Sequence, residues 1–179
     1  MVVGRAAARA GLLDCEDRVM MMDELSRLRE LAGSFPERSR PVFGPPASPE
    51  AVLAFEQALG LRLPDEVREF LFVCDAIVAM NVWNGYWIGG TADLTRMACR
   101  EDLPRGFLPH EERVQLAPIA TDGGGNAFLI AIDNGSICYW EHETGNISKV
   151  ADSFTAFLGR VAEDWKHAAM GNEDWHYLV

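Results

Sequence analysis

A glycine-rich segment, TDGGGNAF (residues 121–128), separates two apolar runs and restricts the fold more than any other feature of the sequence. The run before it is VQLAPIAT, and the run after it is AFLIAID. Both are typical of β-strands, and the second is apolar throughout, as expected of a central strand covered on both faces. We therefore predict that Gly123, Gly124 and Gly125 connect two adjacent strands. At least one of these glycines should have a positive φ, because the chain must reverse abruptly there.

Two chemical roles for this loop find little support in the residues around it. A dinucleotide-binding loop needs a helix after its glycines, and a Walker loop needs a lysine followed by serine or threonine. Here a strand follows the glycines, and neither the GxGxxG spacing nor that lysine is present. A calcium loop needs several oxygen ligands, and the segment offers Asp122, Asn126 and Thr121. A structural turn is favoured, in which Asn126 bonds to its own loop and Asp122 caps it.

The residues after this turn predict a second hairpin and a final helix. Asn134 and Gly135 tolerate positive φ and form a strong hairpin signal within DNGS, with SICYWEH as the returning strand. Residues 144–146 predict another turn, into the short strand ISKVA. Asp152 and Ser153 would then cap a helix. The apolar side chains of this helix recur at helical spacing: Phe154, Phe157, Leu158, Val161, Ala162 and Trp165.

The first 47 residues predict peripheral structure. Residues 1–19 have no clear periodicity and are interpreted as a loosely docked tail. Leucines then recur every three residues in a short helix that Gly33 could close. Residues 34–47 hold four prolines and predict an extended linker that lies over the surface. The main domain is predicted to span residues 48–179.

Two short helices open this domain in the sequence. SPE at residues 48–50 suits a helix start, because serine caps, proline fits the first position and glutamate favours the positive end. Gly60 would end that helix, and LRLPD leads into a second one. Residues 76–99 are interpreted as strands joined by a turn at Asn84-Gly85, and residues 100–112 as a loop.

This order of elements predicts a single α+β domain with a largely antiparallel or mixed sheet flanked by helices. The largest apolar side chains at inward positions should form its core. They are Phe55, Phe70, Leu71, Phe128, Ile130, Phe154, Phe157 and Leu158.

The net charge of −11 is unevenly distributed. Residues 1–100 carry 11 basic and 14 acidic side chains, a net of −3, whereas residues 101–179 carry 5 and 13, a net of −8. Such a surface repels phosphate backbones and disfavours nucleic-acid binding. It would attract a basic protein partner, although acidity that only maintains solubility remains the simpler interpretation of charge alone.

No motif for catalysis, a cofactor, a metal or a membrane is found in the sequence. There is no GxSxG, the four histidines show no metal-ligand spacing, and no apolar run approaches the roughly 20 residues that span a bilayer. A signal peptide is not expected, because acidic residues follow the short apolar patch near the N-terminus. Cys74 and Cys138 lie in apolar stretches and are interpreted as buried free thiols in a reducing cytoplasm.

Three stretches in order resemble the SUKH superfamily. They are PEAVLAFEQALGLRLPDEVREFL (residues 49–71), IATDGGGNAFLIAID with SICYWEHET (residues 119–144), and ADSFTAFLGRV (residues 151–161). The resemblance covers about two-thirds of the chain. One departure is that members tend to carry an Asn-Gly turn soon after the second helix, where this chain has Cys74-Asp75-Ala76. Asn84-Gly85 would be that turn, displaced by an insertion.

The resemblance implies a non-enzymatic binding protein. The superfamily is best known for bacterial immunity proteins and also includes a yeast cell-wall regulator. By resemblance, this chain would be a cytoplasmic immunity protein that neutralises a toxin, often a nuclease, by covering it. The eukaryotic members imply the alternative of a regulatory scaffold for an endogenous protein.

Aromatic side chains next to carboxylates are the candidate partner contacts, because such aromatics dominate many protein interfaces. We expect Trp140, Glu141 and Glu143, with Asp122 at the neighbouring turn, to form part of an acidic binding face. One ring of the pair Tyr139 and Trp140 should face outward. A second candidate group is Trp83, Tyr86 and Trp87 on the predicted hairpin. Core packing is the competing interpretation of every aromatic residue in both groups.

Overall fold

The computed structural model describes residues 15–83, 85–104 and 115–172. Its helices are α1 (Cys15–Ala32), α2 (Pro49–Leu59), α3 (Asp65–Val73), α4 (Thr91–Ala98) and α5 (Phe154–Ala169), with a 3-10 turn at Glu37–Ser39. Its strands are β1 (Val42–Phe43), β2 (Ala76–Ala79), β3 (Tyr86–Gly89), β4 (Leu116–Asp122), β5 (Ala127–Ala131), β6 (Ile137–Trp140) and β7 (Ile147–Ala151).

Within the described residues the strands form one seven-stranded sheet whose order follows the chain, β1 to β7. Each neighbouring pair is antiparallel. The α+β prediction is confirmed, and the sheet is antiparallel rather than mixed. Short connections between sequential strands explain this, because a parallel pair needs a long crossover.

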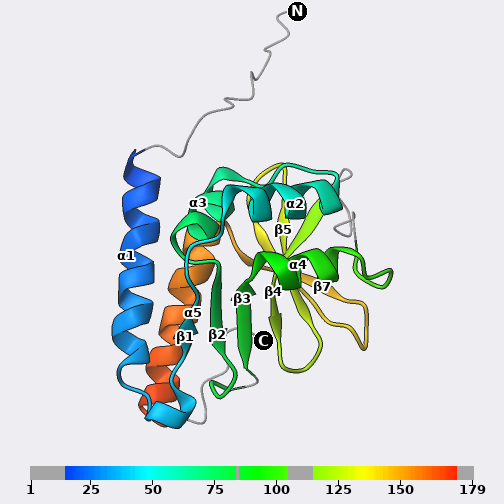
Figure 1. Cartoon of the computed structure of the whole chain (residues 1–179). Coiled ribbons are helices and arrows are strands. Elements are labelled where there is room, and N and C mark those ends of the chain that lie inside the picture. The colour runs from blue at the N-terminus through cyan, green and yellow to red at the C-terminus, as the bar shows by residue number, and fades with distance from the viewer. Residues whose placement is uncertain (1–14, 84, 105–114, 173–179) are drawn as a thin grey trace, which may run out of the picture.

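Helices cover both faces of the sheet (Figure 1). Helix α5 packs on one face, with α1 beside it and running in the same direction. On the other face, α4 contacts β4 and α2 packs on α4. The strand β5 is buried at every position, with alternate side chains in the two cores. Its unbroken apolar run is thereby explained.

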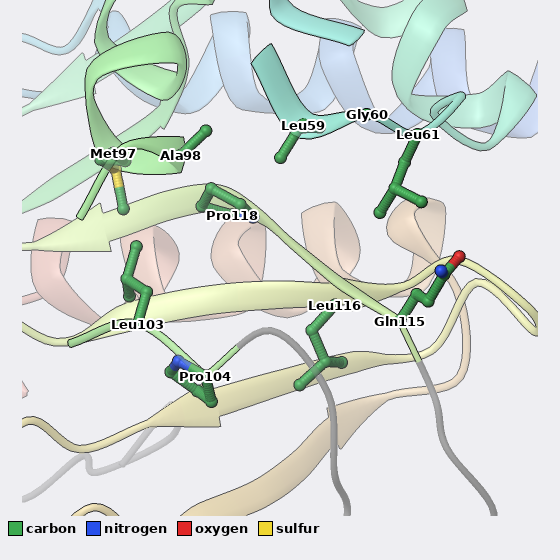
Figure 2. A pocket seen from close by; sticks show the side chains of 10 residues that line it. All are labelled: Leu59, Gly60, Leu61, Met97, Ala98, Leu103, Pro104, Gln115, Leu116 and Pro118. Carbon is green, nitrogen blue, oxygen red and sulfur yellow. The ribbon is translucent and has the colours of Figure 1, made fainter. Parts of the chain in front are cut away.

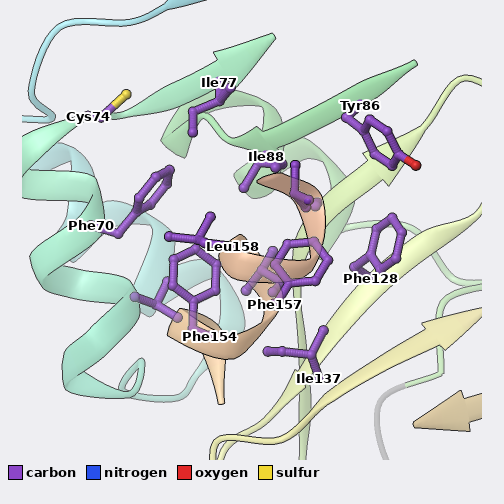
Figure 3. Close-up of a cluster of buried hydrophobic side chains, with 14 of the residues drawn as sticks. Phe70, Cys74, Ile77, Tyr86, Ile88, Phe128, Ile137, Phe154, Phe157 and Leu158 are labelled. Atoms are coloured by element: carbon purple, nitrogen blue, oxygen red, sulfur yellow. The ribbon is translucent and has the colours of Figure 1, made fainter. Parts of the chain in front are cut away.

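The main core lies between α5, α3 and the sheet (Figure 3). Phe157 packs its ring against Phe128 with centroids 5.0 Å apart, and Phe70 meets Phe154 at the same distance. The predicted core is confirmed, since all eight of its side chains are at most 1% exposed. A smaller apolar cluster lies on the opposite face and includes Leu129 and Trp140.

The predicted turns and caps are also confirmed. The glycine segment joins β4 to its antiparallel neighbour β5, and Gly125 has a φ of 91°. Gly135 has a φ of 73° in the turn between β5 and β6. The side chains of Ser48 and Ser153 accept hydrogen bonds at the starts of α2 and α5, and Gly60 ends α2 with a φ of 67°.

The N-terminal predictions need correction. Helix α1 already includes residues 15–19, which were interpreted as tail. The side chains of residues 16, 18, 19 and 20 are exposed. Because this turn buries no apolar stripe, the sequence carried no periodic signal for it. The predicted linker contains β1, which pairs with β2, and Phe35 is buried. Phe43 packs edge-on against Trp165 with centroids 6.2 Å apart. The segment is therefore an integral edge of the sheet.

Residues 76–99 contain the predicted hairpin followed by a helix that was not predicted. Strands β2 and β3 pair, and Gly85 has a φ of 84°, although Asn84 lies outside the described residues. Helix α4 then begins after Gly90, which has no side chain to cap it, and the Thr91 N–H is accepted by the side chain of the distant Asp75. A short helix without a local cap residue gives little sequence signal. Most of the predicted loop at residues 100–112 lies outside the described residues.

Candidate functional site

The carboxylate of Asp122 organises the glycine turn. Its Oδ1 accepts the backbone N–H groups of Gly124 and Asn126, at 2.9 and 3.0 Å. Its Oδ2 accepts the Asn126 side-chain amide at 2.8 Å and the Tyr139 hydroxyl at 3.0 Å. The predicted cap is thus confirmed, and both carboxylate oxygens are engaged within the domain. A partner that formed a hydrogen bond or ion pair with the Asp122 carboxylate would compete with these four hydrogen bonds.

The neighbouring hairpin is tied to the same turn by His142. Its backbone N–H and its Nδ1–H both donate to Asn126 Oδ1, at 3.0 and 2.9 Å. The imidazole covers Gly125, where an added Cβ would lie 3.6 Å from the ring. His142 therefore holds the glycine turn against the start of the β6–β7 turn. No cluster of three metal-ligating side chains occurs in the parts of the chain that the structure describes.

Trp140 does not present an exposed ring. Tyr139 and Trp140 point to opposite faces of the sheet, as strand alternation predicts, but both faces are covered. Trp140 is 6% exposed, and the Arg100 guanidinium lies 5.9 Å from its ring centroid. The expectation of an outward ring is therefore wrong. Trp140 is part of the smaller apolar cluster that also includes Leu129. Of the two acidic candidates on this hairpin, Glu143 is exposed and Glu141 is half-buried and accepts the Thr144 hydroxyl.

The tip of the β2–β3 hairpin is braced against α5. Tyr86 is 5% exposed and donates its hydroxyl to the buried carboxylate of Asp164 at 2.7 Å. The Trp83 indole N–H donates to the Asp164 backbone oxygen at 3.2 Å. Tyr86 is thus a support for the hairpin and not an accessible partner contact, contrary to its place among the candidates.

Trp83 combines exposure with an unusual backbone conformation. Among the described residues it is the one non-glycine with a positive φ, at 50°, and 37% of its surface is exposed. Met80 on the same tip is 55% exposed. Strained backbone of this kind persists only where the surroundings hold it, and it concentrates at functional sites. The tip therefore presents two large apolar side chains next to a hydrogen bond that joins it to α5.

The buried tyrosine predicts a stability that falls at high pH. Burial, and then the Asp164 carboxylate, raise the pKa of Tyr86 far above its usual value of 10.0. The unfolded chain then loses this proton first, so Tyr86 stabilises the fold below pH 10 and loses that contribution as the pH rises. Unfolding in urea should show wild-type stability falling, relative to Tyr86→Phe, by about 1.4 kcal/mol per pH unit above pH 10. Parallel pH profiles for the two proteins would contradict this.

The sheet face that α4 and α2 cover contains an apolar hollow of about 270 Å³ (Figure 2). The end of α2 lines it with Leu59, α4 with Met97, and β4 with Leu116 and Pro118. Among the described lining residues, Gln115 is the one with a polar side chain. Small-molecule sites normally add several convergent polar groups to an apolar wall. The described part of this lining holds no such set of polar groups.

Two of the cysteines, Cys74 and Cys138, show no sign of activation. Cys74 and Cys138 are buried free thiols, as predicted. Burial raises the pKa of both thiols, which disfavours the reactive thiolate. No helix in the described part of the chain is long and apolar enough to cross a membrane.

Most of the domain matches a known family of proteins. The model of the SMI1 / KNR4 family (SUKH-1) matches residues 46–160, more than half of the chain. The chain belongs to the SMI1 / KNR4 family. The predicted resemblance to the SUKH superfamily is thereby confirmed. The match begins just before α2 and ends within α5, so that α1 and β1 lie outside it.

A short stretch is also similar to a prophage protein. The SPbeta prophage-derived uncharacterized protein YokK of Bacillus subtilis (strain 168) is 36% identical over 53 residues. These cover 27% of this chain and 28% of the relative. The matched part therefore spans little more than a quarter of that relative.

Two aspects of the surface were not found from the sequence. Met80 and the backbone of Trp83 carry no motif, because exposure and positive φ depend on how the hairpin meets α5. Trp87 was named as a candidate and is half-buried, with a buried indole N–H that has no hydrogen-bond partner among the described residues. The sequence signals for this region were an apolar run beside Asn-Gly and the group of aromatic residues Trp83, Tyr86 and Trp87.

Proposed function

We propose that this chain is a non-enzymatic, cytoplasmic immunity protein that neutralises a bacterial toxin by binding and covering it. Membership of the SMI1 / KNR4 family supports protein binding as the general role, and the family is generally non-enzymatic. The polar groups nearest to a catalytic arrangement, Asp122, Tyr139 and His142, are engaged in holding the glycine turn. This leaves recognition, rather than chemistry, as the function that the geometry favours.

The β2–β3 tip is the observation that carries this proposal. Trp83 and Met80 are large, exposed and apolar, and the Trp83 indole is fixed by its bond to α5. Tryptophan is enriched among the residues that dominate protein interfaces, and a rigid anchor loses little conformational freedom on binding. We place the toxin contact at this tip, with Glu141 and Glu143 of the β6–β7 turn retained as acidic candidates.

The charge of the chain favours a basic toxin. The net charge is −11, and nuclease surfaces that bind nucleic acid tend to be basic. Complementary charge accelerates association and excludes wrong partners more than it adds affinity. A nuclease-type toxin is therefore the proposed target, covered sterically or through charge mimicry.

Trp83→Ala should weaken binding of the toxin domain encoded by the neighbouring gene by at least about 2 kcal/mol, roughly thirtyfold in Kd. Met80→Ala tests the same tip without touching the bond to α5. Leu53→Ala is the matched control, because Leu53 is likewise an exposed apolar side chain, at 53%, but lies on α2. Binding kinetics and toxin protection in co-expression are the measurements. Equal Kd values for all three variants would remove the tip from the interface.

The acidic candidates are tested with the same toxin. Reversing Glu141 and Glu143 to lysine should slow association and flatten its salt dependence, because rim charges act mainly on encounter. If the neighbouring gene encodes no toxin, or the chain binds none, a regulatory scaffold for an endogenous protein becomes the better proposal. Pull-down from the native host with wild type and Trp83→Ala in parallel then tests that alternative.

A further inference from the structure

A groove of about 440 Å³ lies between α1 and the first turns of α5. Helix α1 contributes Asp17, Met20, Asp23 and Glu24 to its walls, and α5 contributes Thr155, Ala156 and Gly159. Glu66 of α3 lines the groove where α5 begins. The two long helices stand side by side at this edge of the molecule (Figure 1).

The groove has a definite lower limit because the helices approach closely at Gly159. An added Cβ at Gly159 would lie 3.4 Å from the carboxyl group of Glu24. One turn further along both helices, Arg27 pairs with Glu163. The helices are therefore held together below the groove, and the groove itself is part of a fixed packing arrangement.

The described ionisable side chains that line the groove are all acidic, and one of them, Glu24, also pairs with Arg27 at 3.5 Å. The start of α5 adds no anion-binding capacity, because the Glu66 carboxylate accepts the Phe154 N–H at 2.8 Å. The Ser153 hydroxyl accepts the Ala156 N–H at 3.1 Å. With the helix start capped by the protein itself, the field in the groove favours a cation.

Apolar side chains are exposed next to these carboxylates. Met20 is 51% exposed and lines the groove, and its neighbour Val19 is 53% exposed. Helix α1 thus directs apolar residues to the surface although it also buries Met21, Leu25 and Leu28 in the core. Methionine adapts its shape to different partners and is favoured on binding surfaces.

We infer that this groove docks a basic, partly apolar segment of a protein partner. Lysine or arginine side chains would lie against Asp23, and an apolar side chain would rest on Met20. Helix α1 lies outside the residues that match the family model, whereas the groove walls from α3 and α5 lie inside them. The groove would contribute to partner choice. That the partner is a toxin rests on the proposed function, whereas the preference for a basic segment does not.

The first test uses a short fluorescein-labelled peptide of lysine, leucine and glycine, with fluorescence anisotropy against the full chain. Asp23→Lys should weaken binding by at least about tenfold, and Met20→Ser by about threefold or more. The control is Asp133→Lys, which makes the same charge change at an exposed site on the β5–β6 turn. It should stay within about twofold of wild type at physiological salt. Equal losses for both lysine variants would indicate diffuse charge attraction and overturn the inference, as would unchanged binding by Met20→Ser.

The second test separates the groove from the proposed function. If the neighbouring toxin binds wild type and Asp23→Lys equally while Trp83→Ala fails, the groove is not a docking surface for that toxin and this inference is wrong. If wild type binds no toxin, the immunity proposal falls and the peptide measurement still decides the groove. Thermal unfolding of every variant ensures that lost binding does not reflect lost folding.

Discussion

Replacing Phe157 by alanine is expected to lower the free energy of unfolding by about 3–5 kcal/mol. Phe157 is fully buried, and its ring lies 5.0 Å from that of Phe128 and 6.1 Å from that of Phe154. The substitution removes the ring where α5 meets the sheet, and neighbours held on α5 and β5 can collapse into the space only in part. Urea unfolding followed by tryptophan fluorescence measures this loss.

Two further variants serve as controls for the stability loss of Phe157→Ala. Phe157→Leu keeps most of the apolar volume and should cost clearly less than alanine. Leu53→Ala removes an aliphatic side chain that is 53% exposed on α2, and should change stability by no more than about 0.5 kcal/mol. A Phe157→Ala loss as small as that of Leu53→Ala would contradict the assignment of Phe157 to the core.

Elements with local signals could be predicted from the sequence. The glycine turn, the Asn134-Gly135 turn and the Ser153 cap each combine a turn or cap residue with clear flanking periodicity. In α5, the apolar residues fall on one stripe from Phe154 to Trp165, and all of them are buried. These features depend on few residues in one segment, and the structure confirms them.

Features that depend on distant contacts could not be predicted. Residues 15–19 continue α1 without an apolar stripe, and β1 is a strand because it pairs with β2. Helix α4 begins after Gly90, and its first N–H is accepted by the side chain of Asp75, which lies before β2. These elements are held by their neighbours, and tertiary contacts override weak local propensity.

The candidate site shows the same division. Alternation correctly places Tyr139 and Trp140 on opposite faces, but whether a face meets solvent depends on what packs on it. The sequence predicts that Asp122 caps its loop, while its fourth bond, from Tyr139, comes from another strand. The exposure of Trp83 follows from the contact between a hairpin and α5, which no local pattern encodes.

The second large effect is expected at Gly89, at the end of β3. Its φ is 73°, and an added Cβ would lie 2.3 Å from the backbone oxygen of Asp75 and 2.8 Å from the Phe70 ring. That oxygen cannot move away easily, because it accepts the Gly90 N–H, and the Asp75 side chain accepts the Thr91 N–H at 2.8 Å. Gly89→Ala therefore adds a steric clash to an unfavourable backbone conformation.

We expect Gly89→Ala to destabilise the protein by about 2–5 kcal/mol, the sum of a left-handed backbone cost of about 1–2 kcal/mol and an overpacking cost of about 1–3 kcal/mol. Gly60→Ala provides a matched control. Gly60 has a φ of 67° but no atom within 4 Å of an added Cβ, so its loss should be only the backbone part, about 1–2 kcal/mol. Urea unfolding of both variants compares the two costs directly. Equal losses would mean that the junction of β2, β3 and α4 accommodates a methyl group, and that its close approach to Asp75 is not what requires glycine there.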